Sequence, residues 1–315
     1  MTLPSHDPKV YTSLEQLVGL RHQASGFVFL PRQPVRSLLA GGHASKLRGR
    51  GLDFEEIRKY VPGDDPRAID WRVTARTRQP HTRVYTEERE RPVLLLVDQR
   101  LGMFFGSVLL MKSVVAAQAA ALTAWRTVAV KDRVGAIVFN DTQITDLRPQ
   151  RTTPHVTRLL QLIVDQNQSL RADADTPPNP GQLNEVLKRA VRLATHDHLI
   201  VLISDATGAD ADTRKWLTAI SHHNDVLVMF VEDPLESDLP AIRRGVVTDG
   251  TQELELDFTA SALRTRFRDE HQERRQTARR FLLSREVPVM PLRTDSEVVG
   301  QIRRQLGARP RVPHA

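Results

Sequence analysis

The chain of 315 residues carries 45 Lys and Arg against 38 Asp and Glu, which gives a net charge of +7, and it contains no cysteine. Hydrophobic residues make up 40% of it, which excludes a disordered protein, and the length allows one large or two modest domains. The missing cysteine excludes disulfides, thiolate metal sites and cysteine nucleophiles. No apolar run reaches the roughly 18 residues of a membrane span, and residues 1–10 lack the apolar core of a signal peptide. We therefore expect a cytoplasmic protein.

The first ninety residues are polar and rich in turn-forming residues. An apolar patch at 27–30 is followed by two prolines, which predicts a short strand or turn. A stretch rich in Gly and Arg covers 41–51, and residues 62–64 form a Pro-Gly-Asp turn sequence. We expect a small β-rich extension over residues 1–90.

From residue 92 onward, continuous apolar runs alternate with helical patterns. Such runs predict strands buried on both faces, and their alternation with helices is typical of βαβ units. We therefore predict a doubly wound, mostly parallel α/β domain of Rossmann type over residues 91–307, followed by a tail at 308–315. The predicted strands cover 93–97, 134–139, 199–203, 226–231 and 287–290, the helices 108–130, 155–165, 182–194, 213–221, 260–284 and 297–306, and an edge hairpin 246–258.

Two of the predicted strands end in an aspartate, Asp98 for the first and Asp205 for the third. Ligands of open α/β sheets bind at the carboxyl ends of the strands, near the point where the strand order reverses. We expect these two carboxylates to lie close together on that functional edge.

A signature of a dozen residues runs from Tyr60 to Trp71. Its pattern, Y-x-P-G-D-D-x-R-x-I-D-W, resembles the signature of domain-of-unknown-function family 58, and the similarity extends from about Gly41 to Leu306. The residues that carry it are Tyr60, Pro62, Gly63, Asp64, Asp65, Arg67, Asp70 and Trp71.

The resemblance implies a von Willebrand factor A-like domain that carries an N-terminal β-rich extension. It also implies a partner, because genes of this family commonly accompany MoxR-type AAA+ ATPases. A binding or adaptor role beside such a chaperone-like ATPase is therefore what the resemblance implies.

The metal site typical of a von Willebrand factor A domain is degenerate here. That site holds Mg²⁺ through D-x-S-x-S, a later Thr and an Asp after the fourth strand, all of them hard oxygen ligands. Asp98 and Asp205 are present, but Arg100 and Gly102 replace the two serines, and Gly181 falls near the Thr position. An Arg would repel a divalent ion and could neutralise both carboxylates itself. We expect no bound Mg²⁺ and no other cofactor, and a partner-binding edge built from Asp98, Arg100, Gly102 and Asp205.

The acidic cluster in the signature has two interpretations. Asp64, Asp65 and Asp70 could act as an acid/base pair in an unrecognised hydrolase. Alternatively they accept backbone N–H bonds in a turn, Arg67 pairs with them, and Trp71 anchors the subdomain. No nucleophile or base is visible nearby, which favours the turn.

Other motifs point away from catalysis. The chain has no P-loop, no G-x-G-x-x-G after the first strand and no G-x-S-x-G elbow, so we expect no ATP hydrolysis and no dinucleotide chemistry. The His-x-His at 196–198 lies on the opposite edge of the predicted sheet. The basic residues between 32 and 50 would suit nucleic acid, but no aromatic residue lies between Phe29 and Phe54.

The sequence thus predicts a non-catalytic protein-binding or adaptor protein. We expect it to work with a MoxR-type AAA+ ATPase in the assembly or maturation of other proteins. Two alternatives stay open: a hydrolase that uses Asp64, Asp65 or Asp70, and a nucleic-acid-binding protein that uses the basic N-terminal region.

Overall fold

The computed structural model describes residues 7–25, 52–87, 91–173, 177–237, 245–248, 253–256 and 287–306. The chain divides into two compact units, and each is described by itself. Unit 1 consists of Met1–Gln33 and Arg91–Ala315, and unit 2 of Pro34–Glu90. The helix predicted at 260–284 and the basic stretch at 32–50 lie outside the described residues.

Unit 1 is built on a six-stranded sheet with the order β10-β7-β6-β3-β4-β5. Every neighbouring pair is parallel except β4 and β5, which are antiparallel. This arrangement confirms the predicted doubly wound, mostly parallel α/β fold. The strands are β3 (Val93–Asp98), β4 (Val134–Phe139), β5 (Ile144–Gln150), β6 (Leu199–Ser204), β7 (Asp225–Glu232) and β10 (Val289–Arg293).

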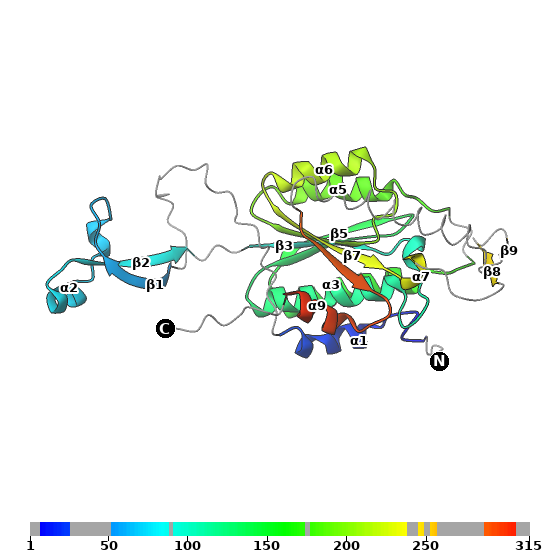
Figure 1. Ribbon diagram of the computed structural model, residues 1–315, viewed down its shortest axis with the longest axis horizontal. Helices are drawn as coiled ribbons and strands as arrows, with labels where there is room; N and C mark the ends of the chain where they lie inside the picture. Colours follow the sequence, from blue (N-terminus) through cyan, green and yellow to red (C-terminus); the bar gives the residue numbers. More distant parts are fainter. Residues whose placement is uncertain are drawn as a thin grey trace. The chain divides into compact units, whose positions relative to one another are not determined.

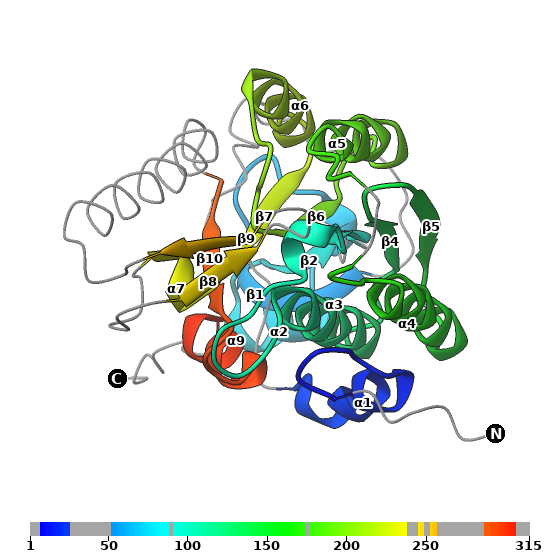
Figure 2. The same ribbon diagram turned by 90° about the vertical axis from the view of Figure 1, so that its right-hand side faces the viewer.

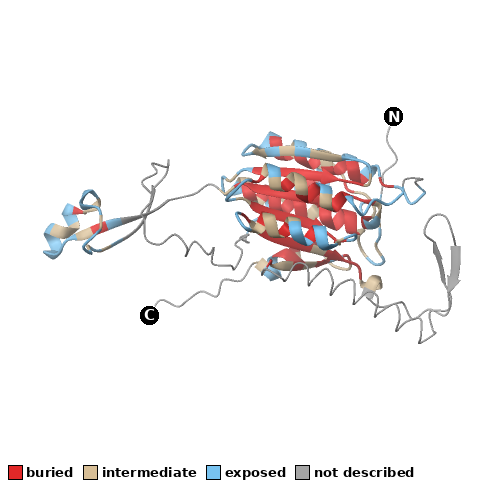
Figure 3. Ribbon diagram, turned by 90° about the horizontal axis from the view of Figure 1, so that it is seen from above, coloured by how far each residue is buried: buried red, intermediate tan, exposed pale blue. Residues whose placement is uncertain are grey.

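Helices cover both faces of this sheet, with α5 and α6 on one face and α1, α3, α4 and α9 on the other (Figures 1 and 2). Alternate strand residues therefore enter different cores. Leu94 and Leu96 pack with α5 and α6, whereas Leu95 and Val97 pack with α3. Figure 3 shows the resulting buried strands. The helices are α1 (Leu14–Gly19), α3 (Lys112–Ala129), α4 (Thr153–Gln168), α5 (Gln182–Leu193), α6 (Ala211–Ser221) and α9 (Val298–Leu306).

The N-terminal residues group with the sheet and not with the β-rich part expected over residues 1–90. Leu17 of α1 is fully buried in the core, and its carbonyl accepts a 3.0 Å hydrogen bond from Nε1 of Trp125. The guanidinium of Arg21 lies over the same indole ring. A capping box of Ser13 and Gln16 starts the helix, and this sequence signal was overlooked.

Unit 2 contains β1 (Leu52–Lys59) and β2 (His81–Glu87), which pair in antiparallel fashion. Their connection carries the short 3-10 turn η3 (Pro66–Ala68) and the helix α2 (Trp71–Thr77). The whole signature from Tyr60 to Trp71 therefore lies in one connection of this unit.

Two smaller elements complete the description. The hairpin predicted at 246–258 corresponds to β8 (Gly245–Thr248) and β9 (Glu253–Leu256), which form an antiparallel sheet of their own. The short helix α7 (Pro234–Ser237) follows β7. Within the described ranges, no helix is both long enough and apolar enough to cross a membrane.

Candidate functional site

The strand order reverses between β3 and β6, since the chain proceeds from β3 to β4 on one side and later returns to β6 on the other. In such sheets the crevice at this point is the usual binding position. Asp98 ends β3, and Asp205 directly follows β6. We call the edge of the sheet at which β3, β6, β7 and β10 end the carboxyl edge.

Arg100 neutralises Asp98 directly. Its Nη2 lies 2.7 Å from Oδ2 of Asp98 and its Nε 3.0 Å from Oδ1, while its backbone N–H donates to the same carboxylate. The hydroxyl of Ser204 donates a further bond of 2.7 Å. Asp98 is 0% and Arg100 4% exposed, so the pair lies beneath the surface. Burial opposes the charge of Arg100, but Asp98 outweighs burial and raises the pKa of the guanidinium.

A second cation, Lys112, binds the other aspartate. Its Nζ lies 2.8 Å from Oδ2 of Asp205 and 2.6 Å from Oε1 of Glu236 in α7. Lys112 is the first residue of α3, and its side chain is 3% exposed. Lys112 was not predicted from the sequence as part of the site. The signal that could have indicated it is a lysine at the first position of a helix whose other residues are mostly apolar. The five residues Asp98, Arg100, Lys112, Asp205 and Glu236 form what we call the ion-pair cluster.

The pKa values at this second pair follow from burial and charge. Burial alone would raise the pKa of Asp205, but the ammonium of Lys112 and the N–H of Thr207 outweigh it and hold the pKa below its ordinary value. Burial would lower the pKa of Lys112, and the carboxylates of Asp205 and Glu236 raise it instead. Both groups are therefore charged across the neutral range.

The loop before α5 reaches the same edge. Asp141 accepts the backbone N–H of Leu101 at 2.6 Å and that of Asn179 at 2.7 Å, so it joins this loop to the segment after β3. Nη1 of Arg100 lies 3.5 Å from the carbonyl oxygen of Pro180. The expected Thr position at Gly181 thus adjoins the cluster.

The residues present do not fit Mg²⁺. A Cβ placed on Gly102 would lie 3.9 Å from Oδ2 of Asp205, so a serine there would stand beside the carboxylate, as a metal site requires. Here the carboxylates of Asp98 and Asp205 already bind a guanidinium and an ammonium, whose charges repel a divalent ion. Across the described part of the chain, no group of three or more His, Asp or Glu is arranged to hold a metal.

Two exposed apolar side chains lie on the segment between Arg100 and Lys112, the two cations of this cluster. Phe105 is 39% and Val108 67% exposed, on the segment that links β3 to α3. Nζ of Lys112 lies 5.9 Å from the centre of the Phe105 ring. Asp233, which directly follows β7, accepts the backbone N–H and the hydroxyl of Ser107, and these bonds hold the segment that links β3 to α3. Exposed apolar side chains therefore lie on the segment that links β3 to α3, whereas the side chains of the cluster are buried and ionic.

The signature carboxylates serve as structural acceptors in unit 2. Asp64 binds Arg58 through two bonds of 2.7 and 2.9 Å and accepts the N–H of Val61. Asp65 accepts the backbone N–H of Arg67 at 2.9 Å, which caps η3. The bonds from Arg58 and Val61 hold the pKa of Asp64 below its ordinary value.

Asp70 caps α2 in the same way. It accepts the backbone N–H groups of Arg72 and Val73, and Nε of Arg83 lies 2.8 Å from its other oxygen. The bond from Arg83, followed by that from Val73, lowers the pKa of Asp70. The acceptor role of the aspartates agrees with the turn interpretation, but their side-chain partners are Arg58 and Arg83 and not Arg67.

Trp71 does not anchor unit 2, because 69% of it is exposed. It is the first residue of α2, and Asp70, which precedes it, holds the helix in place. The His-x-His at 196–198 is also solvent-facing: His196 pairs with Asp197 at 3.0 Å, and His198 bonds the carbonyl of His196. The structure therefore separates the expected residues into the buried cluster in unit 1 and the signature in unit 2.

The comparisons with known proteins agree with the signature. The family described as "Protein of unknown function DUF58" matches residues 56–278. Uncharacterised proteins of Mycobacterium bovis and Mycobacterium tuberculosis are 30% identical over 285 residues, which cover 89% of this chain and 86% of each relative. A solved structure of the conserved hypothetical protein BatB from Bacteroides thetaiotaomicron has 14% identity and a TM-score of 0.39, and covers 67% of this chain and 93% of that one. The chain belongs to the DUF58 family of proteins of unknown function.

Proposed function

We propose that this chain is a non-catalytic binding protein whose protein partner docks on the carboxyl edge without a bridging metal ion. The contact surface is centred on Phe105 and Val108, and the ion-pair cluster beneath it acts as a rigid support. The buried residues Asp98, Arg100 and Asp205 then shape the surface but do not touch the partner.

The observation that carries this proposal is the self-neutralised cluster. Arg100 and Lys112 occupy the oxygens of Asp98 and Asp205, and all four side chains are at most 7% exposed. A general base or nucleophile needs to reach a substrate, and none of these groups can. Apolar residues held on a fixed segment are instead what the centre of a protein interface uses.

For the partner we propose a MoxR-type AAA+ ATPase, with this chain as its adaptor in the assembly or maturation of other proteins. The support is the resemblance carried by the signature from Tyr60 to Trp71, together with the missing nucleotide-binding motifs. An adaptor of this kind leaves ATP hydrolysis to its partner.

A pull-down with a MoxR-type AAA+ ATPase from the same organism tests the proposal. We expect the wild type to retain the ATPase and Phe105→Ala to retain less. Failure of the folded wild type to retain it, with the nucleotide present and absent, would contradict the partner that we name.

The hydrolase alternative gains no support from the site. Asp64 and Asp70 are engaged by arginines and backbone N–H groups, and their lowered pKa values make them weak bases. A screen of ester, phosphoester and peptide substrates decides the matter: turnover that is lost in Asp64→Ala would favour the hydrolase.

A further inference from the structure

We propose a second binding surface, on unit 2, that takes an acidic segment of a protein partner. It consists of Trp71 with Arg67, Arg72, Arg76 and Arg78, which we call the Trp71 face. This surface is separate from the carboxyl edge, and the proposal does not depend on the identity of the partner that docks there.

The signature builds a fixed platform for this face. Asp64 and Asp70 join the connection to β1 and β2 through Arg58 and Arg83. The backbone N–H of Tyr60 donates to the carbonyl of Pro80, which joins the two ends of the connection. The backbone N–H of Asp70 donates to the carbonyl of His81, which ties the middle of the connection to the start of β2. A surface that is already rigid loses little entropy when a partner binds.

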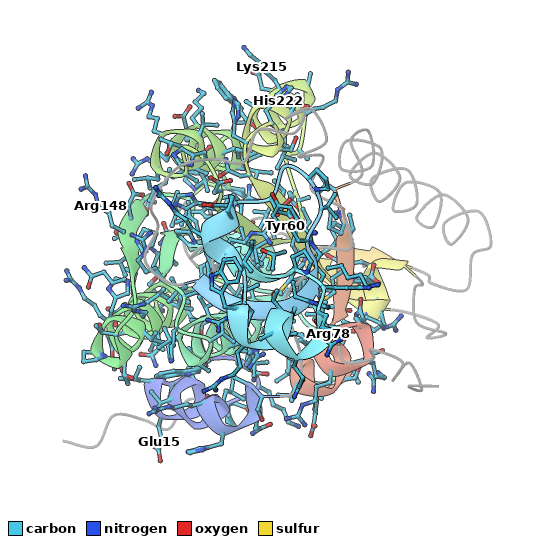
Figure 4. All side chains as sticks on the ribbon, turned by 90° about the vertical axis from the view of Figure 1, so that its left-hand side faces the viewer. Glu15, Tyr60, Arg78, Arg148, Lys215 and His222 are labelled. Atoms are coloured by element: carbon cyan, nitrogen blue, oxygen red, sulfur yellow. The ribbon has the colours of Figure 1, made fainter. Side chains whose placement is uncertain are left out.

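The exposed residues of α2 follow two adjacent stripes. Trp71, Ala75 and Arg78 are spaced four and three residues apart, and Arg72 and Arg76 four apart, which places each set on one side of the helix. All five are exposed. Figure 4 labels Arg78 just beyond α2. Tryptophan and arginine are the residue types most enriched at the energetic centres of protein interfaces.

The arginines of this face have no carboxylate partner within the described ranges. Arg58 and Arg83 are the cations that engage the signature aspartates, whereas no ion pair there includes the side chains of Arg67, Arg72, Arg76 or Arg78. Four exposed arginines in η3, in α2 and directly after α2, without a carboxylate partner in the described ranges and within seven residues of the exposed Trp71, favour a ligand that brings both carboxylates and an apolar group.

The distribution of charge over residues 52–87 favours a protein over a nucleic acid. Residues 66–83 hold five Arg and one Asp, a balance of +4, while residues 52–65 and 84–87 hold two cations and six acids, a balance of −4. Residues 52–87 are therefore neutral overall, with their positive charge concentrated in 66–83, and the whole of unit 2 has a balance of +3. A phosphate backbone binds best to an extended basic surface, whereas in residues 52–87 the basic part adjoins acidic parts on both sides in sequence.

Fluorescence anisotropy on the full chain tests the proposal. The probe is a labelled peptide of alternating Glu and Leu, with its Gln and Leu counterpart as the neutral control. We expect the acidic peptide to bind, and both Trp71→Ala and Arg72→Gln/Arg76→Gln to weaken it by about tenfold or more. These side chains are exposed, so circular dichroism should show both variants folded.

The matched control is Arg214→Gln/Lys215→Gln. It removes two exposed cations of α6, of which Lys215 lies beside Trp216 and projects away from the helix (Figure 4). This variant should leave the affinity unchanged.

The proposal is overturned if the acidic peptide does not bind, if the control variant weakens peptide binding equally, or if oligothymidine binds more tightly than the peptide. It is also overturned if Trp71→Ala changes only self-association, because the occupant is then a second copy. None of these outcomes involves the ATPase, so they are independent of the pull-down.

Discussion

Nζ of Lys112 lies 2.8 Å from Oδ2 of Asp205, and this contact joins the first residue of α3 to the residue that follows β6. Arg100 binds Asp98 on the neighbouring strand in the same manner. The two aspartates at the carboxyl edge are thus neutralised by two side chains of the protein itself.

The first prediction concerns the stability that depends on Lys112. Lys112→Met leaves the buried carboxylate of Asp205 without its cation, so we expect the free energy of unfolding to fall by about 3–5 kcal/mol. The control is Lys188→Met, which removes a cation paired with exposed Glu185 and should cost about 1 kcal/mol or less. Urea unfolding measures both, and equal losses would contradict the structural role of Lys112.

The second prediction is the pH dependence of that loss. Without the ammonium, burial raises the pKa of Asp205 above its unfolded value. When a carboxyl has a higher pKa in the folded than in the unfolded protein, the free energy of unfolding falls as the pH rises from the unfolded-state pKa to the folded-state pKa. The loss of stability in Lys112→Met should therefore be larger near pH 8 than near about pH 5. In the wild type the pKa of Asp205 is lowered, and its contribution is lost only in acid.

The double variant Lys112→Met/Asp205→Asn provides the control for this pH effect. Arg100 and Glu236 also face the pair, and both stay in place in this variant. We expect its unfolding free energy to vary with pH as that of the wild type does. A deficit in Lys112→Met that is the same at both pH values would show that Asp205 stays ionised without Lys112.

The third prediction concerns divalent ions. Because Arg100 and Lys112 hold the two aspartates, calorimetric titration with Mg²⁺ or Mn²⁺ should give no binding heat. The melting temperature should be the same with and without a chelator. Micromolar affinity that disappears in Asp98→Ala would overturn our interpretation of the cluster.

The fourth prediction concerns Gly208, which has φ of +83° and faces the loop before α5. A Cβ there would lie 2.5 Å from Cβ of Pro180, so Gly208→Ala should cost about 1–3 kcal/mol. Gly19→Ala is the matched control, because nothing lies within 4 Å of its Cβ and it ends α1 in a helical conformation. It should stabilise the protein by up to about 1 kcal/mol. Thermal unfolding distinguishes the two.

The fold could be predicted because its central strands are continuous apolar runs. Those runs located β3, β4, β6 and β7, and the aspartates that end β3 and β6 followed from the topology. β5 was missed because it is an edge strand in which exposed residues alternate with half-buried ones, without an apolar run. The pairing of Arg100 with Asp98 was predicted because Arg100 stands at a serine position of the metal-site pattern. Arg100 was also expected to neutralise Asp205, but Lys112 binds that carboxylate instead.

Lys112 and Trp71 could not be assigned from the sequence for a physical reason. Lys112 and Asp205 are 93 residues apart, and only the packing of α3 against the sheet brings their charges together. Trp71 was expected to anchor the subdomain, but the helix cap at Asp70 fixes α2 and leaves Trp71 69% exposed.

The affinity of the carboxyl edge for its partner tests the central claim most directly. Titration of the MoxR-type ATPase into the wild type, Phe105→Ala/Val108→Ser and Val130→Ser compares two apolar residues at this edge with one exposed residue that follows α3. We predict that the double variant binds at least about tenfold more weakly and that Val130→Ser binds like the wild type. Unchanged binding by the folded double variant would contradict the account.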